Sequence, residues 1–210
     1  MLLGLLADIH EKSNFLAAAL RHFHHQSVDQ VVVLGDIFDT GRRLDSVIRL
    51  LEEAGAVGVW GNHELGLCHE PEPEFLAKFP VATTQFFARL RPRWEVERYL
   101  ATHALPTIDP TNPLDYYSSS IRPQEEAARA ACFAKYSNRV LLMGHYHCWF
   151  AATPEQVLSW QGEGPLNLSA SPSWIIVVHA VMHGWCAVLD TQREVLTPCK
   201  LSASRNGSNV

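Results

Sequence analysis

The sequence predicts an α/β protein with parallel strands in its first half and a strand-rich last third. Strand-like and helix-like segments alternate over residues 1–62 with short connections, which is the order of parallel β-α-β units. From residue 148 onward, the apolar segments are short and strand-like. With 210 residues and 47% apolar side chains, the chain can bury a core without disulfides. We therefore expect one domain over residues 1–201, followed by a disordered polar tail at 202–210.

Local patterns place the elements of the first half. Three apolar runs have the length of buried strands, at residues 2–7, 30–35 and 56–60. Apolar residues recur at helical spacing after Ser13, which is a suitable N-cap. They recur again over residues 44–51, and Gly55 stands where a helix C-cap belongs.

The elements of the second half of the chain are predicted from weaker local patterns. Helices are expected at 83–90 and from Pro123 to Lys135. In the second of these, Pro123, Glu125 and Glu126 suit the first turn and Lys135 suits the last. The stretch 104–120 is rich in turn-forming residues and is expected to be a loop. Strands are expected at 96–102, 138–143, 149–152, 156–160, 165–170, 174–181, 184–190 and 194–201, with residues 191–193 joining the last two as a hairpin.

Composition excludes several classes of function. The net charge is −5 and no apolar run reaches the roughly 18 residues of a membrane helix, so we expect neither a nucleic-acid nor a membrane partner. The start of the chain lacks the basic region of a signal peptide. The five Cys are odd in number and scattered, which favours reduced thiols in a cytoplasmic protein. The sequence does not predict an oligomeric state.

Polar residues that can bind metal ions directly follow five of the predicted strands. The carboxyl ends of parallel strands form the ligand crevice of an open α/β sheet, so we expect these residues to converge. Carboxylate, amide and imidazole groups without Cys suit Mn, Fe, Zn, Co or Ni. Seven candidates are too many for one ion with open positions, but they fit two ions that share a carboxylate. These candidates are Asp8, His10, Asp36, Asn62, His103, His145 and His147.

Taken in order, these motifs resemble those of the calcineurin-like metallophosphoesterases. The chain carries D-x-H, G-D-x-x-D, G-N-H-E, a lone His and G-H-x-H between residues 8 and 147. One such motif alone occurs by chance in many proteins, whereas five in order, each at a strand end, form a specific signal. The resemblance implies a two-sheet α/β sandwich with helices packed outside.

The resemblance also implies a role for each site residue. The first ion would be held by Asp8, His10, Asp36 and His147. Asp36 would bridge to a second ion completed by Asn62, His103 and His145. His63 would donate a proton or hydrogen bond to the leaving oxygen, and Asp39 would orient His63. Glu64 is expected to be a structural hydrogen-bonding residue.

One departure from the family pattern and one alternative role for Asp39 bear on these assignments. Phosphoprotein phosphatases carry G-D-x-x-D-R-G, whose Arg contacts phosphate, whereas this chain has Thr40 at that position. The chain is therefore closer to the bacterial phosphoesterase branch, and Arg42 or Arg43 is a candidate phosphate contact. Asp39 could instead cap the helix that begins near residues 41–44.

The expected function is hydrolysis of a phosphate monoester or diester of a small substrate by a metal-bridged hydroxide. Four alternatives stay open: a hydrolase of nucleotides (a diadenosine polyphosphate or a cyclic nucleotide), a phosphoprotein phosphatase, a nuclease, and a non-catalytic scaffold of the same fold. The net charge counts against a nuclease. The presence of His63 and of every ligand position counts against a scaffold. The sequence predicts neither the substrate nor the identity of the metals.

Overall fold

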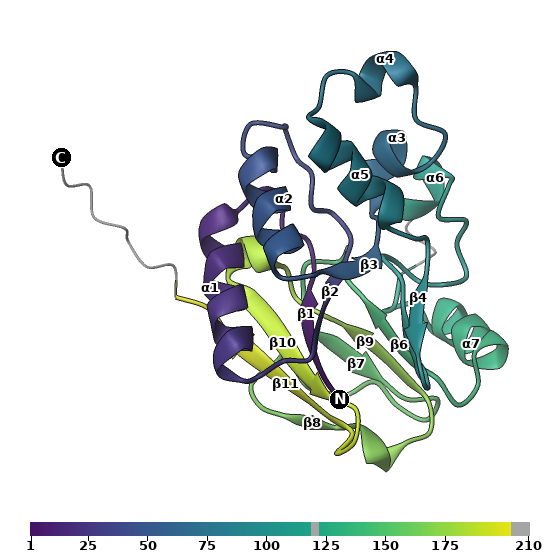
Figure 1. The fold of residues 1–210 in the computed structure, drawn as a ribbon. Coiled ribbons are helices and arrows are strands. Elements are labelled where there is room, and N and C mark those ends of the chain that lie inside the picture. The colour runs from purple at the N-terminus through teal and green to yellow at the C-terminus, as the bar shows by residue number, and fades with distance from the viewer. Residues whose placement is uncertain (119–121, 203–210) are drawn as a thin grey trace.

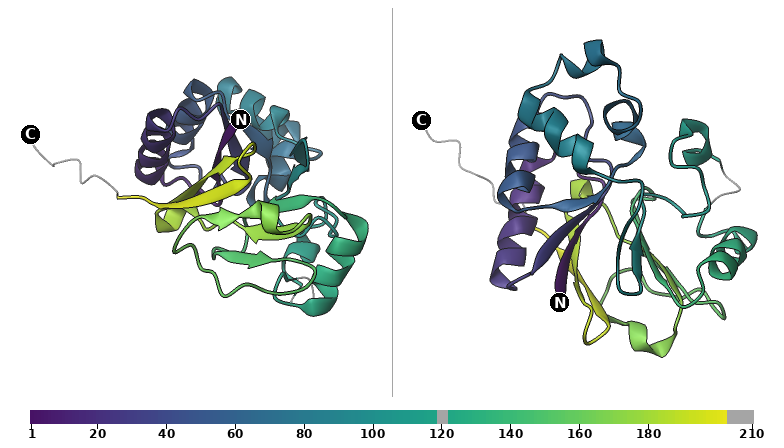
Figure 2. Two further views of the ribbon diagram at one scale, coloured as in Figure 1. Left: turned by 90° about the horizontal axis from the view of Figure 1, so that it is seen from below. Right: turned by 45° about the vertical axis from the view of Figure 1, so that its right-hand side comes forward.

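The computed structural model describes residues 1–118 and 122–202 (Figure 1). Two mixed β-sheets lie face to face, and helices cover their outer faces (Figure 2). The predicted two-sheet α/β sandwich is thereby confirmed. The predicted tail at 202–210 lies, apart from Ser202, outside the described residues.

The first sheet has six strands in the order β3-β2-β1-β10-β11-β8. Its parallel strands are β1 (Leu2–Leu6), β2 (Gln30–Leu34) and β3 (Val57–Val59). Its antiparallel strands are β10 (Trp185–Asp190), β11 (Val195–Lys200) and β8 (Leu166–Asn167). The helices packed on its outer face are α1 (Ser13–His25), α2 (Leu44–Glu53) and α5 (Val81–Arg89).

The second sheet has five strands in the order β4-β5-β6-β9-β7. Its parallel strands are β5 (Tyr99–Ala101), β6 (Val140–Met143) and β9 (Trp174–Val177). The antiparallel edges are β4 (Trp94–Val96) and β7 (Phe150–Ala152). Helix α7 (Glu126–Lys135) covers the outer face of this sheet.

Short helices occupy several of the connections. They are η1 (Asn62–Glu64), α3 (Leu65–Cys68), α4 (Pro73–Leu76), α6 (Pro113–Tyr116), η2 (Leu168–Ala170) and η3 (Val181–His183). Helix α6 lies inside the stretch that the sequence predicts as loop. Pro113 at its N-terminus and the Asn112 side chain, which accepts the N–H of Leu114, explain why a helix begins there.

The alternation of side chains along each strand builds the core. Leu3 and Leu5 of β1 face the second sheet, where they share one buried cluster with Leu142 of β6. Gly4 faces the opposite way, toward α1. A Cβ at Gly4 would lie 2.6 Å from the ring of Phe23, so this position accepts no larger residue while Phe23 packs there.

Two predicted strands differ from the structure. The segment predicted as one strand at 96–102 contains the last residue of β4, the hairpin turn at Glu97 with a φ of 52°, and β5. The segment predicted as a strand at 156–160 forms a single bridge between Val157 and Ala152. Its apolar pattern has another cause, because Trp160 is buried against the Trp149 ring with the ring centroids 5.3 Å apart.

Two predicted boundaries also shift. Ser13 is the first residue of α1 and does not cap it, since the N-cap position is Lys12 and carries no side-chain cap. The strand predicted at 165–170 shortens to β8, because Asn167 accepts the N–H of Ser169 and starts the 3-10 turn η2. Gly55 follows α2 in the left-handed conformation expected of a C-terminal glycine, with a φ of 59°.

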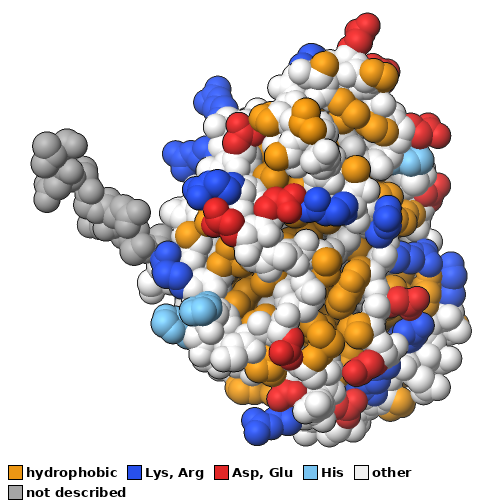
Figure 3. Space-filling model, viewed as in Figure 1, with side chains coloured by type: hydrophobic (Ala, Val, Ile, Leu, Met, Phe, Trp, Pro, Cys, Tyr) orange, Lys and Arg blue, Asp and Glu red, His pale blue; other side chains and the backbone are white. Residues whose placement is uncertain are grey.

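The surface carries charges of both signs, and Figure 3 shows acidic and basic side chains interspersed over one face. Within residues 1–118 and 122–202, every helix is too short or too polar to cross a membrane.

Candidate metal centre

The loops that follow five parallel strands meet at one end of the seam between the two sheets. Three of them follow β1, β2 and β3 of the first sheet, and two follow β5 and β6 of the second. The sequence predicts that these loops converge at one sheet edge. In the structure, the loops come from two sheets, because the carboxyl ends of β1, β2 and β3 lie next to those of β5 and β6. Each sheet therefore supplies part of one polar cluster.

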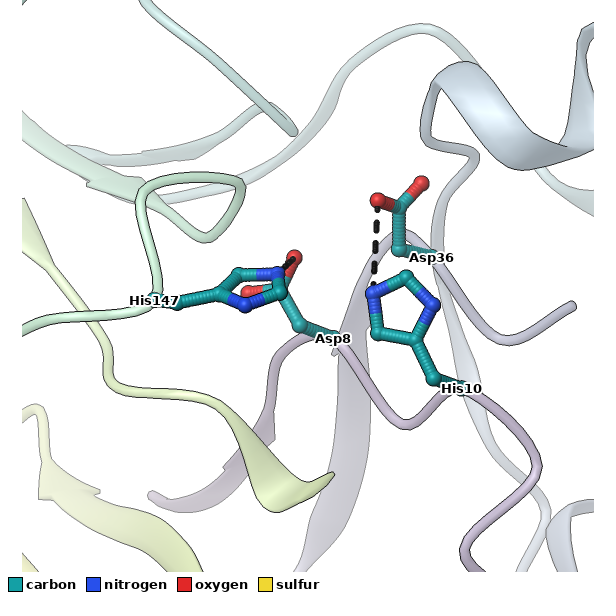
Figure 4. Close-up of side chains that lie close together, drawn as sticks. All are labelled: Asp8, His10, Asp36 and His147. Carbon is teal, nitrogen blue, oxygen red and sulfur yellow. Dashed lines mark ion pairs between the residues drawn. The ribbon is translucent and has the colours of Figure 1, made fainter. Parts of the chain in front are cut away.

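One group of possible ligands comprises Asp8, His10, Asp36 and His147, and Figure 4 shows their side chains converging. Each offers one ligand atom, and these atoms all lie within 4.8 Å of one another. His147 Nε2 is 3.3 Å from Asp8 Oδ1, and His10 Nε2 is 3.7 Å from Asp36 Oδ2. Both oxygens of buried Asp8 accept the main-chain N–H of His145 at 3.0 Å, which fixes the carboxylate.

A second group comprises Asp36, His103 and His145, again with ligand atoms within 4.8 Å of one another. His103 Nε2 lies 3.3 Å from Asp36 Oδ1 and 3.1 Å from Asn62 Oδ1. Asn62 therefore borders this group through its amide oxygen. Asp36 is common to both groups, which is the arrangement that a bridging carboxylate requires.

Main-chain carbonyls orient two of the imidazoles. The carbonyl of Leu34 lies 2.7 Å from His103 Nδ1, and the carbonyl of Tyr116 lies 2.9 Å from His145 Nε2. A carbonyl can only accept, so each of these ring nitrogens donates its N–H. In the neutral rings, the lone pairs then lie on His103 Nε2 and His145 Nδ1, which are free to bind a metal ion.

The donor set fits divalent metal ions. His10 Nε2 is buried and has no hydrogen-bond partner among the described residues. A buried polar atom without a partner is costly, and a metal ion would satisfy it. The mixture of carboxylate, amide and imidazole donors without thiolate suits Mn, Fe, Zn, Co or Ni, as the sequence predicts.

The backbone is unusual at most of these residues. Left-handed conformations with positive φ are uncommon outside glycine, and they concentrate at functional sites. Five of the candidate ligands have such a φ: Asp8 (50°), His10 (42°), Asp36 (53°), His145 (66°) and His147 (50°).

Glu64 connects the loops that follow β2 and β3 through hydrogen bonds to their main chain. Its carboxylate is fully buried and accepts the main-chain N–H groups of Asp36 (2.9 Å), Gly61 (2.8 Å) and Phe38 (2.7 Å). This is the structural role expected from the sequence. Burial and the charge of Asp36 raise the pKa of Glu64 to about 7, against the effect of its N–H donors.

Two residues of the site are not predicted from the sequence. Buried Glu11 accepts the main-chain N–H groups of Asp39, Gly41 and Arg43, and so shapes the loop after Asp36. Tyr117 Oη accepts from Asn62 Nδ2 at 3.1 Å, which turns the amide oxygen toward His103. No local pattern signals either residue, because their partners are 28 to 32 and 55 residues away in the chain.

His63 lies beside the first group. Its side chain is 34% exposed, and its Nε2 is 4.0 Å from Asp36 Oδ2. The carboxylate of exposed Asp39, His10 and His63 also offer ligand atoms within 4.8 Å of one another. The structure thus brings Asp39 to His63. Asp39 does not cap α2, whose N-cap position is Arg43 and has no side-chain cap.

The remaining candidates lie at the rim. Arg42 and Arg43 are exposed, and the main-chain N–H of Arg43 donates to Glu11 at 2.9 Å. In the described parts of the chain, neither guanidinium contacts the ligand groups. The ring of His183 lies 5.4 Å from that of His147, and His179 follows at 5.4 Å from His183, so both extend the imidazole cluster away from the centre.

The charges of the site shift several pKa values. Burial lowers the pKa of His103, but the Asp36 carboxylate outweighs burial and raises it to about 9. Burial raises the pKa of Asp36, but His103 outweighs this effect and holds it well below its usual range. Burial and the neighbouring His103 lower the pKa of His145 to about 4. Before any ion binds, His103 is therefore an imidazolium at pH 7, whereas His145 is a neutral imidazole with one N–H.

Comparison with known families gives one match that covers most of the chain. The model of the calcineurin-like phosphoesterase family matches residues 1–168, which include all seven candidate ligands.

Individual relatives are more distant. A metallophosphoesterase from Sphaerobacter thermophilus superposes with a TM-score of 0.77 at 18% identity, over 97% of this chain and 89% of that one. A putative diadenosine tetraphosphatase superposes with a TM-score of 0.58 at 17% identity, over 98% and 95%. A 61-residue segment, 29% of this chain, is 36% identical to the class 3 fructose-1,6-bisphosphatase of Clostridium acetobutylicum, of which it covers only 9%.

Proposed function

Because this chain belongs to the calcineurin-like phosphoesterase family, we propose that it hydrolyses phosphate esters at a centre of two divalent metal ions. The observation that carries the proposal is the position of Asp36, whose carboxylate belongs to both ligand groups. Two ions that share a carboxylate can activate a water molecule and stabilise the entering and leaving oxygens of a phosphoryl centre.

The ligand assignment follows the two groups. Asp8, His10, Asp36 and His147 would hold the first ion, and Asp36, Asn62, His103 and His145 the second. Glu64 and Glu11 position these loops through main-chain N–H groups and would not touch the substrate.

His63 is proposed as the general acid. It is accessible, whereas the proposed ligands His10 and His103 are buried, so it can face a substrate. Its protonated form would donate to the leaving oxygen as the ester bond breaks. A carboxylate near an imidazole limits the rotation of the ring, and this orienting role is the one proposed for Asp39.

The substrate is proposed to be a small phosphorylated molecule. The names of two similar proteins, a bisphosphatase and a putative tetraphosphatase, describe substrates with more than one phosphoryl group. The retention of every ligand position supports an enzyme over a non-catalytic scaffold.

A direct assay tests the proposed function. Protein stripped with a chelator and reloaded with Mn(II), Fe(II), Zn(II), Co(II) or Ni(II) is compared on p-nitrophenyl phosphate and bis(p-nitrophenyl) phosphate. We expect hydrolysis of at least one ester with one of these ions, and a loss of about a hundredfold or more in the stripped protein. Absence of both metal uptake and hydrolysis with every ion would favour the scaffold and refute the proposal.

The pKa of His103 predicts that metal binding releases a proton. At pH 7 free His103, with a pKa of about 9, carries a proton that must leave before its Nε2 can bind an ion. His145, with a pKa of about 4, is already neutral and releases none. The apparent affinity should therefore rise up to about tenfold per pH unit and level off near pH 9.

Calorimetric titration with Mn(II) in buffers of different ionisation enthalpy counts the released protons. At pH 7, we expect the release of about one proton for each ion that binds to the second ligand group. A count of zero would show that His103 is neutral in the free protein.

A further inference from the structure

A cavity of about 260 Å³ opens beside the second ligand group. Its lining residues are Tyr116, Tyr117, Arg122, Gln124, His145 and Tyr146, and we call it the Arg122 pocket. The proposed metal ligand His145 forms part of its wall. Tyr117 also links the pocket to the metal centre, since its Oη accepts a hydrogen bond from the proposed ligand Asn62 through Nδ2. The pocket therefore adjoins the second ligand group, with His145 and the Asn62–Tyr117 pair between them.

Among the described residues that line the pocket, none carries a carboxylate, and Arg122, Gln124 and Tyr117 offer hydrogen-bond donors. Arg122 is exposed and forms no ion pair within the described residues. The carboxylate of Asp115 on α6 is engaged by Asn112 Nδ2 (2.7 Å) and by the N–H of Asp109 (3.1 Å). The charge of Arg122 is thus left available for a ligand.

Other donors stand beside Arg122. Tyr117 is 69% exposed, and because its oxygen accepts from Asn62, its own hydrogen is free to donate. The amide of Gln124 adds two further N–H donors. A guanidinium with adjacent neutral donors suits a phosphoryl group, whose oxygens accept several hydrogen bonds at once. At roughly 30 Å³ per water molecule, the pocket has room for such a group and part of its linker.

We propose that the Arg122 pocket binds a second phosphoryl group of the substrate, while the first lies at the metal centre. The substrate class is then a molecule with two phosphoryl groups, joined by an anhydride or carried on separate hydroxyls. This inference rests on the proposed function, because it assumes that the first phosphoryl group is the one hydrolysed.

Matched synthetic substrates test the pocket. Straight-chain diols of increasing length are prepared as monophosphates and as bisphosphates, and kcat/KM is measured for each with the Mn(II)-loaded protein. For at least one length, we expect the bisphosphate to be preferred about tenfold or more. The preferred length reports the distance between the centre and the pocket. Equal kcat/KM values for the two forms at every length would overturn the proposal.

Variants assign the preference to the pocket. Arg122→Gln should abolish the preference through a rise in KM for the bisphosphate, with p-nitrophenyl phosphate hydrolysed within about twofold of the parent rate. Arg122→Lys should keep part of the preference, because it retains the charge without the bidentate geometry. Arg193→Gln, at a side chain 85% exposed on the β10–β11 hairpin, is the matched control and should change nothing. A preference that survives Arg122→Gln would overturn the assignment.

A binding measurement separates this inference from the proposed function. The non-hydrolysable bisphosphonate and monophosphonate of each diol are titrated calorimetrically into the metal-loaded parent and Arg122→Gln proteins. Tighter binding of the bisphosphonate to the parent alone supports the pocket even if no ester is hydrolysed. Hydrolysis of p-nitrophenyl phosphate with equal affinity for both phosphonates would leave the enzyme assignment standing and refute the pocket.

Discussion

His63→Ala is expected to lower kcat about 10²–10⁴-fold on alkyl phosphates, while the protein still takes up both ions. The reason is the position of His63, which faces solvent beside the first ligand group, with Nε2 4.0 Å from Asp36 Oδ2. An alkoxide leaves poorly unless it is protonated as the ester bond breaks. The loss should be much smaller for p-nitrophenyl phosphate, whose leaving group departs without a proton.

The measurement combines elemental analysis of bound metal with kcat for both substrates. His24→Ala, at an exposed histidine of α1, is the control and should match the parent. Unchanged turnover of alkyl phosphates would refute the general-acid role. Loss of an ion from the variant would instead place His63 among the ligands.

Asp36→Asn is expected to remove both ions and, with them, the activity. Asparagine keeps an oxygen that can accept the N–H of His63, as Asp36 Oδ1 does at 3.1 Å, so the loops should keep their shape. It loses the negative charge and replaces the second oxygen with a donor, which cannot bind a cation. Even residues that only orient metal ligands are worth 10–100-fold in affinity, so the loss at a shared ligand should exceed about a hundredfold.

Dialysis against limiting Mn(II), followed by elemental analysis and an activity assay, measures this effect. Asp45→Asn, at an exposed residue of α2, serves as the control for removal of one acidic group. Retention of one full equivalent of metal would mean that Asp36 serves a single ion and that the centre is not bridged through this carboxylate.

The sequence predicts the parts of this fold that local pattern determines. The runs at 2–7 and 30–35 became β1 and β2, because continuous apolar residues suit strands buried on both faces. Local pattern fails where long-range packing decides. The apolar pattern of residues 156–160 predicts a strand, but the segment forms only one β-bridge among the described residues, and Trp160 packs against the ring of Trp149 in the core between the sheets.

The candidate ligands could be identified for a similar reason. Each lies within about four residues of the end of a strand, so strand position and residue type together reveal it without knowledge of the contacts. Glu11, Tyr117 and Arg122 could not be identified this way. Glu11 and Tyr117 act on loops 28 to 55 residues distant, and Arg122 reaches the site through a connection that has no regular pattern.

The division of the ligands between two sheets has a mechanical consequence. Asp8, His10 and Asp36 lie in loops that follow strands of the first sheet, and His103, His145 and His147 lie in loops that follow strands of the second. Each ion would therefore hold the two halves of the sandwich together. A ligand that binds only the folded chain stabilises it by about 4 kcal/mol at a thousand times its Kd. Metal supply would then govern the protein's resistance to opening along this seam, and hence its lifetime, as well as its catalysis.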